Sequence, residues 1–284
     1  MVSFRFKKKW NPVFVSDHEA QIFITQRLEA GTTFNRVGTT ELKVLLHVLN
    51  KGTNLPAKIR QEAQYGAGYY YETRAELIRF CDQMLAIHDN SNYIASFPTL
   101  RQREYEQILN YNPAKRLQLG HYEPYKFKDN YFRFFHGKKI TVVSSFVHTV
   151  SAQLPKFGQL HKFISEEVEF QLVGAPQTNA GFYSDGISWQ TRLLALIKHC
   201  ELAGNQHVLI GAGSYGPILA SELSKRGYTS MVIGGGIQLL FGIYGRRWYQ
   251  REDFQQLFNE HWVWPLDEDI PKGHRLVEDS CYWK

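Results

Sequence analysis

The stretch Val208–Gly227, VLIGAGSYGPILASELSKRG, decides the fold that we expect of this chain. It begins with apolar, β-branched residues typical of a buried strand, and it ends in an amphipathic helical segment. Between them lies a turn with the spelling G-x-G-x-x-G, which in this strand–turn–helix context is typical of dinucleotide-binding sites. We therefore predict a ligand site at the end of this strand. The turn residues expected to contact the ligand are Gly211, Gly213, Ser214, Tyr215 and Gly216.

Short apolar runs alternate with segments of helical period along the rest of the chain. This alternation predicts a Rossmann-like α/β fold, with a mostly parallel sheet and helices on both faces. We expect the helical residue Trp189 to pack in the core. We expect residues 31–284 to form one domain, with any seam in the polar, aromatic stretch 110–139. The expected strands are 33–37, 93–97, 140–147, 168–173, 207–210 and 230–233, and the expected helices are 41–49, 72–87 and 188–202.

The composition of the 284 residues limits the classes of protein to consider. Hydrophobic residues make up 43% and charged residues 21%, which is typical of a folded globular protein and argues against disorder. The net charge of +6 is too diffuse to indicate nucleic acid, so no nucleic-acid partner is expected. Cys81, Cys200 and Cys281 lack the spacing of a disulfide framework or a zinc site. No apolar run is long enough to span a membrane, so we expect a cytoplasmic protein.

The first 30 residues are expected to form a basic and aromatic arm. Residues 1–10, MVSFRFKKKW, alternate aromatic side chains with arginine and lysine. Such a segment could make peripheral contact with an anionic membrane, here at the inner face of the cytoplasmic membrane. An arm surrounded by solvent is the favoured interpretation, because polybasic attraction contributes only about 1 kcal/mol per residue.

The nature of the ligand depends on the residues beyond the glycine-rich turn. A phosphate group suits the backbone N–H groups of such a turn and the N-terminus of the helix after it. A NAD site also needs an acidic residue at the end of the next strand, to bind the ribose hydroxyls. This sequence has Gly234, Gly235 and Gly236 there, followed by Gln238. We therefore expect a phosphate-bearing ligand, with NAD much less favoured, contacted by both glycine turns and by Gln238.

A third strand end is expected near residues 34–41, FNRVGTTE. Thr39 is suited to cap the following helix, and Glu41 is favourable in its first turn. Arg36 has no such local explanation. An arginine at the carboxyl end of a strand, two residues before Gly38, suits bidentate contact with a phosphate or carboxylate.

Three motifs together resemble bacterial glycosyltransferases of the GT-D fold, a family linked to polysaccharide biosynthesis. They are the R-x-G-x-x-E motif at 36–41, ITVVSSFVHTVSAQL at 140–154 and VLIGAGSYGPILASELSKRGYTSMVIGGGIQ at 208–238. The resemblance implies a hexosyltransferase-like enzyme that uses a nucleotide-diphosphate sugar, with a UDP-sugar as the expected donor. It implies a glycan or lipid-linked saccharide as acceptor, in surface polysaccharide biosynthesis of the capsule, O-antigen or exopolysaccharide kind.

The resemblance also implies a metal site, because characterised members use an Asp-x-Glu motif to hold a divalent cation against the diphosphate. The matching positions here are Thr39, Thr40 and Glu41. The first carboxylate is therefore absent, and the expectation of Mn²⁺ or Mg²⁺ depends on Glu41 alone, because such cations bind mainly to carboxylate oxygens. Arg36 could neutralise the diphosphate instead.

Glycosyl transfer by an inverting enzyme also needs a base for the acceptor's proton. Glu41 is the first candidate, and Asp185 and His148 are further candidates. For Asp185 a turn or helix cap is an equally good interpretation, and for His148 packing is the better one. The D-x-D segment 267–269 is expected to be a solvated loop. The tyrosines at 65 and 69–71 would suit stacking on sugars.

Two alternative functions remain open from the sequence. The first is an enzyme that binds NAD(P) or S-adenosylmethionine in the turn at 211–216. The second is a non-catalytic subunit that binds a nucleotide sugar but has lost catalysis with the substitution at Thr39.

Overall fold

The computed structural model describes residues 16–90, 93–96, 116–165, 167–181 and 185–284. Its centre is a seven-stranded sheet in the order β3-β2-β1-β7-β6-β4-β5, in which every pair of neighbouring strands is parallel. This confirms the predicted α/β class. The strands are β1 (Phe34–Arg36), β2 (Tyr93–Ser96), β3 (Arg116–Gln118), β4 (Lys139–Ser144), β5 (Glu169–Gly174), β6 (His207–Gly211) and β7 (Thr229–Val232).

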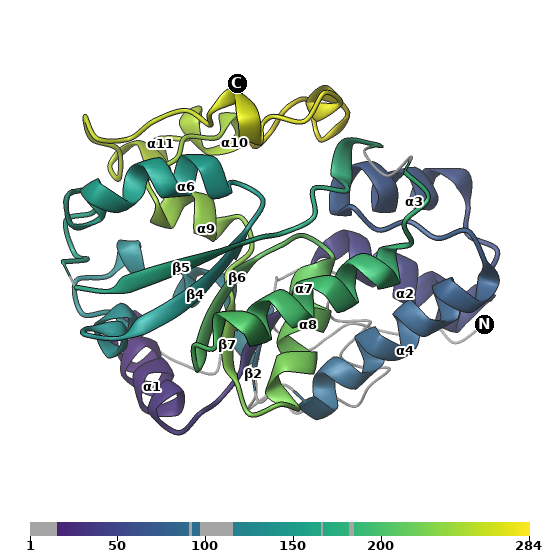
Figure 1. Ribbon diagram of the computed structural model, residues 1–284, viewed down its shortest axis with the longest axis horizontal. Helices are drawn as coiled ribbons and strands as arrows, with labels where there is room; N and C mark the ends of the chain where they lie inside the picture. The colour runs from purple at the N-terminus through teal and green to yellow at the C-terminus, as the bar shows by residue number, and fades with distance from the viewer. Residues whose placement is uncertain (1–15, 91–92, 97–115, 166, 182–184) are drawn as a thin grey trace.

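Helices cover both faces of the sheet, with α2, α4, α7 and α8 on one side and α1, α6 and α9 on the other (Figure 1). The α-helices are α1 (Asp17–Glu29), α2 (Thr39–Lys51), α3 (Ala57–Gln61), α4 (Arg74–Asn90), α6 (Val147–Gln153), α7 (Trp189–Ala203), α8 (Tyr215–Ser224), α9 (Gly236–Leu240), α10 (Arg246–Tyr249) and α11 (Glu252–Gln255). The shorter turns are the π-helix η1 (Glu62–Ala67) and the 3₁₀ turns η3 (Leu119–Tyr122), η4 (Pro124–Lys126), η5 (Tyr131–Phe135), η6 (Leu154–Gln159), η7 (Asn179–Gly181), η8 (Asp267–Asp269) and η9 (His274–Leu276). None of the described helices is long and apolar enough to cross a membrane.

The strand order places the first-half motif and the two glycine turns close to one another. β1 pairs with β2 on one edge and with β7 on the other, while β6 lies between β7 and β4. In the first half of the chain, successive strands are added from β1 through β2 to β3 at one edge of the sheet. In the second half, β6 and then β7 are added toward β1 from the other side. Ligands of open parallel sheets bind where the strand order reverses in this way, at the carboxyl ends of the strands.

The predicted strand at 140–147 ends earlier than expected, at Ser144. The Ser144 hydroxyl accepts a hydrogen bond from the Phe146 N–H at 3.0 Å, and α6 begins at Val147. Within the stretch 110–139, where the sequence places any seam, the described residues 116–139 contain β3 and three 3₁₀ turns, and large side chains of these turns belong to the core. Tyr122 and Phe132 are both fully buried. Aromatic residues in this polar stretch therefore fill the interior rather than mark a linker.

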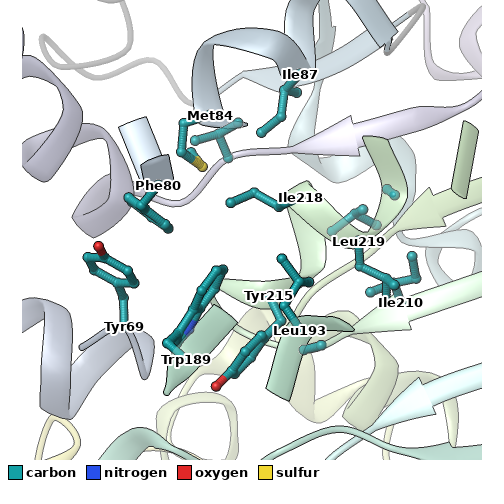
Figure 2. Close-up of a cluster of buried hydrophobic side chains, with 14 of the residues drawn as sticks. Tyr69, Phe80, Met84, Ile87, Trp189, Leu193, Ile210, Tyr215, Ile218 and Leu219 are labelled. Carbon is teal, nitrogen blue, oxygen red and sulfur yellow. The ribbon is translucent and has the colours of Figure 1, made fainter. Parts of the chain in front are cut away.

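The core beneath α4, α7 and α8 is built around the side chain of Trp189 (Figure 2). Its indole stacks on the Tyr215 ring, with centroids 4.5 Å apart and planes within 8°, and its Nε1 donates to the Ser214 hydroxyl at 3.2 Å. Tyr69 packs on the other side of this cluster, where its ring stacks on the Phe80 ring with centroids 3.7 Å apart. Trp189 is therefore a core residue, as predicted, and Tyr69 is buried in the core rather than exposed for stacking on a sugar.

Helix α1 lies within the range 1–30, which the sequence predicts as an arm. It begins with a capping box in which Ser16 and Glu19 bond reciprocally. Ile24 and Leu28 are buried in the second core, and Gln21 donates to the His121 carbonyl at 2.9 Å. Helix α1 is thus part of the packed α/β body. The basic segment 1–10 lies outside the described residues.

Candidate functional site

A cleft of about 300 Å³ opens at the carboxyl edge of the sheet. It is lined by residues at the ends of β1, β4, β5, β6 and β7, together with the end of η1 and the C-terminal segment of the chain. The lining residues taken from the predicted site are Arg36, Gly38, Thr39, Glu41, Gly211, Gly213, Tyr215, Gly234, Gly235 and Gln238. The fold therefore brings most of the predicted positions into one cavity.

Arg36 ends β1 and lies along the turn that follows β7. Its Nη1 donates to the Ile233 carbonyl at 3.0 Å. A Cβ atom at Gly234 would lie 2.9 Å from the Arg36 Cζ, and Gly234 has a φ of +55°. Glycine is therefore needed here for two reasons, the left-handed backbone and the close approach of the guanidinium.

Glu41 is the third residue of α2, and its side chain is buried at 6% exposure. The carboxylate bends back toward the start of the helix, where a Cβ atom at Gly38 would overlap it. Burial raises the pKa of Glu41, against the opposing effects of its own backbone N–H and the charge of Arg36. A buried carboxyl with a raised pKa in a cleft is a candidate for proton transfer.

The glycine-rich turn after β6 is packed against other backbone. A Cβ atom at Gly211 would lie 2.5 Å from the Ile237 Cγ2 and 2.7 Å from the Gly234 carbonyl oxygen. At Gly213, with φ of +50°, it would lie 2.9 Å from the Ala67 carbonyl oxygen. The glycines of the motif thus have a packing explanation in this chain, and Gly211 and Gly213 also line the cleft.

Ser214 and Gly216, which also belong to this turn, do not line the cavity. The N–H of Ser214 donates to the Ala67 carbonyl at 3.0 Å, and its hydroxyl accepts from Trp189. Gly216, in the first turn of α8, faces Val232 and Ile210. Neither Ser214 nor Gly216 is among the lining residues, so the turn presents only part of its predicted ligand contacts.

The glycines after β7 support the wall made by the C-terminal segment. A Cβ atom at Gly235 would lie 3.1 Å from the Trp248 ring and 3.3 Å from Tyr282. Gln238 donates through Nε2 to the carbonyls of Tyr244 and Tyr282 at 2.7 and 2.8 Å. Gly236 is not a lining residue, since it faces the Tyr125 hydroxyl. Gln238 therefore anchors the segment that closes one side of the cavity.

Asp185 and His148 are not among the lining residues of the cleft. Asp185 is exposed, forms an ion pair with Arg192 and accepts from the Ile187 N–H at 3.2 Å. The hydrogen bond from Arg192 lowers the pKa of Asp185. The His148 side chain is exposed at the start of α6. These positions fit the turn interpretation of Asp185 and give His148 no cleft contact.

The prediction of a solvated loop at 267–269 is wrong for Asp269, which is 1% exposed. Its carboxylate accepts from the N–H and the hydroxyl of Thr149 at 2.7 and 2.6 Å and from the His148 N–H at 3.3 Å. These donors belong to the first turn of α6, where a carboxylate is electrostatically favourable. Asp269 therefore ties the C-terminal region to α6, while Asp267 and Glu268 are exposed.

The cleft wall also includes Arg247, Glu278, Tyr282 and Trp283, which the sequence alone does not indicate as site residues. Trp283 is 1% exposed and donates from Nε1 to the Asp269 carbonyl at 3.0 Å. In the sequence, Arg247 could have been found from the basic, aromatic run that follows the second glycine turn. No sequence motif indicates Glu278, because only tertiary contacts bring residues 278–283 over the edge of the sheet (Figure 1).

No protein-family model and no curated protein matches this chain. Solved structures of low sequence identity are similar to it. A selenomethionine structure of domain of unknown function 1792 (DUF1792) has a TM-score of 0.49 and 11% identity, covering 91% of each chain. A structure described as a new glycosyltransferase (DUF1792) from Streptococcus sanguinis has a TM-score of 0.47 and 14% identity, covering 90% of this chain and 95% of that one.

Another similar structure is described as a DUF1792 domain with a distinct glycosyltransferase fold. Its TM-score is 0.44 at 12% identity, and the match covers 79% of this chain and 77% of that one. Because all three TM-scores are below 0.5, these likenesses carry no conclusion about this chain. The function is therefore inferred from the cleft.

The described residues do not provide a set of metal ligands. No three side chains of His, Cys, Asp or Glu gather in the described part of the chain. In the cleft, Glu278 is bound to Arg247, and Glu41 is directed toward the start of its own helix. Among the described lining residues the carboxylates are Glu41 and Glu278, so a divalent cation in the cleft would depend on these and on the phosphate oxygens of a bound ligand. The positively charged side chains that line the cleft and could bind an anion are Arg36 and Arg247.

Proposed function

We propose that this protein is a glycosyltransferase that binds a nucleotide-diphosphate sugar, with a UDP-sugar as the expected donor, in the cleft at the carboxyl edge of the sheet. The observation that carries the proposal is the meeting of Arg36 and Glu41 in one cavity, close enough for the Arg36 charge to act on the Glu41 carboxyl. Glycosyl transfer needs both a positive group for the leaving diphosphate and a base for the acceptor.

In this proposal, Arg36 binds the diphosphate of the donor. Its guanidinium is held at the end of β1 by the Ile233 carbonyl, so little side-chain freedom is lost when an anion binds. A guanidinium can donate two parallel hydrogen bonds to phosphate oxygens. It would thus stabilise the charge that develops on the diphosphate as the sugar leaves.

Glu41 acts in this proposal as the base for the acceptor hydroxyl. Its raised pKa makes the carboxylate a stronger base than an exposed glutamate, while leaving it ionised once the pH exceeds that raised value. The carboxylate would take the proton of the acceptor hydroxyl as that oxygen bonds to the sugar carbon. No step in this proposal is assigned to a metal.

The acceptor in this proposal is a glycan or lipid-linked saccharide of surface polysaccharide biosynthesis. A place in the cytoplasm, with peripheral contact to the anionic inner face of the membrane, belongs to the same proposal. The net charge of +6 supports contact with an anionic surface.

The test is calorimetric titration of the protein with UDP, UDP-sugars, NAD, NADP and S-adenosylmethionine, each with Mg²⁺ and with EDTA. We expect binding of UDP and of at least one UDP-sugar, retained in EDTA. Binding of only NAD(P) or the methyl donor would refute the proposal, and loss of UDP binding in EDTA would refute the metal-independent part.

A second measurement separates catalysis from binding. Sugar transfer from the bound donor is measured over a panel of saccharide acceptors, for the wild type, Glu41→Gln and the matched surface variant Glu167→Gln. We expect Glu41→Gln to bind UDP normally and to lose transfer by about 100-fold or more, as for loss of a general base. Donor binding without transfer in the wild type would instead identify a non-catalytic binding subunit.

A further inference from the structure

Arg247 is a second cationic group of the same cleft, and it is held by the C-terminal segment. Its Nη1 donates to the Tyr282 hydroxyl at 3.0 Å, and its guanidinium lies over the Tyr282 ring, 4.8 Å from the centroid. Its Nη2 is bound to the Glu278 carboxylate. Both Arg247 and Glu278 line the cavity, so this ion pair lies where a ligand would bind.

Tyr282 connects Arg247 with Arg36. Burial raises the pKa of the Tyr282 hydroxyl, and the charge of Arg247 and, more weakly, that of Arg36 act against this rise. Both guanidinium groups therefore lie within electrostatic reach of one hydroxyl. Two arginines around one cavity form a site suited to a ligand with two adjacent negative groups, such as a diphosphate.

The Glu278 carboxylate is presented by an unusual backbone. Glu278, Asp279 and Ser280 have φ angles of 44°, 52° and 66°, three successive non-glycine residues in the left-handed region. This conformation is unfavourable for L-amino acids other than glycine. It is maintained by the bond from Arg246 Nη1 to the Asp279 carbonyl at 3.1 Å and by the contact of Ser280 with His274.

Strained backbone of this kind persists where surrounding contacts impose it, often at ligand sites. Here it directs a carboxylate at Arg247, although the Glu278 side chain remains 66% exposed. An exposed carboxylate leaves such a pair at small cost, because surface ion pairs contribute little to stability. Arg247 is therefore held in place by a partner that a stronger anion can replace.

We propose that Arg247 is a second diphosphate-binding residue of the cleft, and that Glu278 occupies it in the ligand-free protein as a built-in competing anion. This inference rests on the proposed function for the identity of the ligand, a nucleotide-diphosphate sugar. The binding chemistry is that of a diphosphate, whose oxygens would replace the carboxylate on the Arg247 guanidinium. Glu278 would then turn into solvent.

The experiment is calorimetric titration of the full chain with inorganic pyrophosphate and, separately, with UDP. Glu278→Gln removes the competing charge and keeps the shape, so we expect both ligands to bind about two- to fivefold more tightly. Arg247→Gln should weaken both by about tenfold or more. In the double variant, the gain from Glu278→Gln should disappear, because its effect acts through Arg247.

The matched control is Asp279→Asn. Asp279 is the neighbouring carboxylate, has the same left-handed backbone and forms its ion pair with Arg246 at 3.0 Å. We expect unchanged affinity for both ligands. An equal gain in Asp279→Asn would mean a general charge effect, and no gain in Glu278→Gln would mean that Glu278 does not compete; either result overturns the inference.

The two proposals fail separately. Tighter pyrophosphate binding in Glu278→Gln, without sugar transfer by the wild type, would support the diphosphate site and count against the proposed function. UDP-sugar turnover with no effect of Glu278→Gln would do the reverse. Thermal unfolding of each variant, in the absence of ligand, verifies that the fold is intact.

Discussion

The Nη1 of Arg36 donates to the main-chain carbonyl of Ile233 at 3.0 Å, and this bond joins the ends of β1 and β7. These two residues are 197 positions apart in the chain, yet their strands are neighbours in the sheet. The bond fixes the guanidinium beside the turn at Gly234, at the point where the strand order reverses. One side chain thus connects the first-half motif with the second glycine turn.

Replacement of Arg36 by lysine should separate charge from geometry. Lysine keeps the positive charge but lacks the fork of donors that could hold Ile233 and a phosphate together. We expect UDP to bind about tenfold or more weakly to Arg36→Lys, as measured by calorimetry. The control Arg226→Lys, at an exposed position just after α8, should bind UDP as the wild type does. Equal affinity in Arg36→Lys would exclude a bidentate contact.

Glu41→Gln should make the folded protein more stable at neutral pH. The pKa of Glu41 is raised in the folded state above its ordinary value of 4.5, so the folded protein binds this proton more tightly than the unfolded chain does. The buried charge therefore lowers the free energy of unfolding above the raised pKa, and this penalty fades as the pH falls to 4.5. We expect a gain of about 1 kcal/mol at neutral pH that vanishes as the pH falls toward the ordinary pKa of the group.

Urea unfolding across the range from weakly acidic to weakly basic pH measures this difference. Glu167→Gln, at an exposed carboxylate, serves as the control and should show no such trend. A difference between Glu41→Gln and wild type that stays constant with pH would argue against a buried, charged Glu41.

The packing explanation of the glycine motif predicts unequal effects of alanine. At Gly211 the new Cβ would meet Ile237 and the Gly234 carbonyl at 2.5 and 2.7 Å, so Gly211→Ala should cost roughly 2 kcal/mol or more. At Gly216 the nearest atoms are 3.4 and 3.5 Å away, and alanine is favoured over glycine in a helix by about 1 kcal/mol. Gly216→Ala should therefore be neutral or stabilising in chemical unfolding. Equal losses at both positions would contradict this account.

Asp269 and Asp267 should differ sharply on conversion to asparagine. Asp269→Asn places an amide against the donors of Thr149 and His148 and removes a charge-assisted bond, at a cost of roughly 2–3 kcal/mol. The exposed Asp267 should change stability by less than about 0.5 kcal/mol. Thermal and urea unfolding of the two variants compare them directly, and similar stabilities would show that the Asp269 contacts contribute little.

The fold was predictable from the sequence wherever local pattern and burial agree. The strands β4, β6 and β7 are buried on both faces, and their apolar residues, such as Val142–Val143, Val208–Ile210 and Met231–Val232, stand out in the chain. β3 was missed because its three residues lie in a polar stretch, and Arg116–Gln118 are a strand only through pairing with β2. α1 was missed because its apolar residues are few and its stability comes from packing against the body.

The candidate site was predictable in part for the same reason. Turn residues such as Gly38, Gly213 and Gly234 leave a local signature, since glycine is required by close approach or by a left-handed backbone. Residue type also identified Arg36 and Glu41. The sequence alone thus determined the parallel α/β architecture and the strand ends that form the cleft.

Only the tertiary structure decided which side chains share the cleft. It buries Glu41 and so raises its pKa, it leaves Asp185 and His148 outside, and it buries Asp269 against α6. It also brings Glu278 to the cavity, beside Arg247, from a C-terminal segment without a local motif. The burial, ion pairing and pKa of a group depend on neighbours that are distant in the chain. This is because the free energy of a charge is set by the atoms that surround it in space.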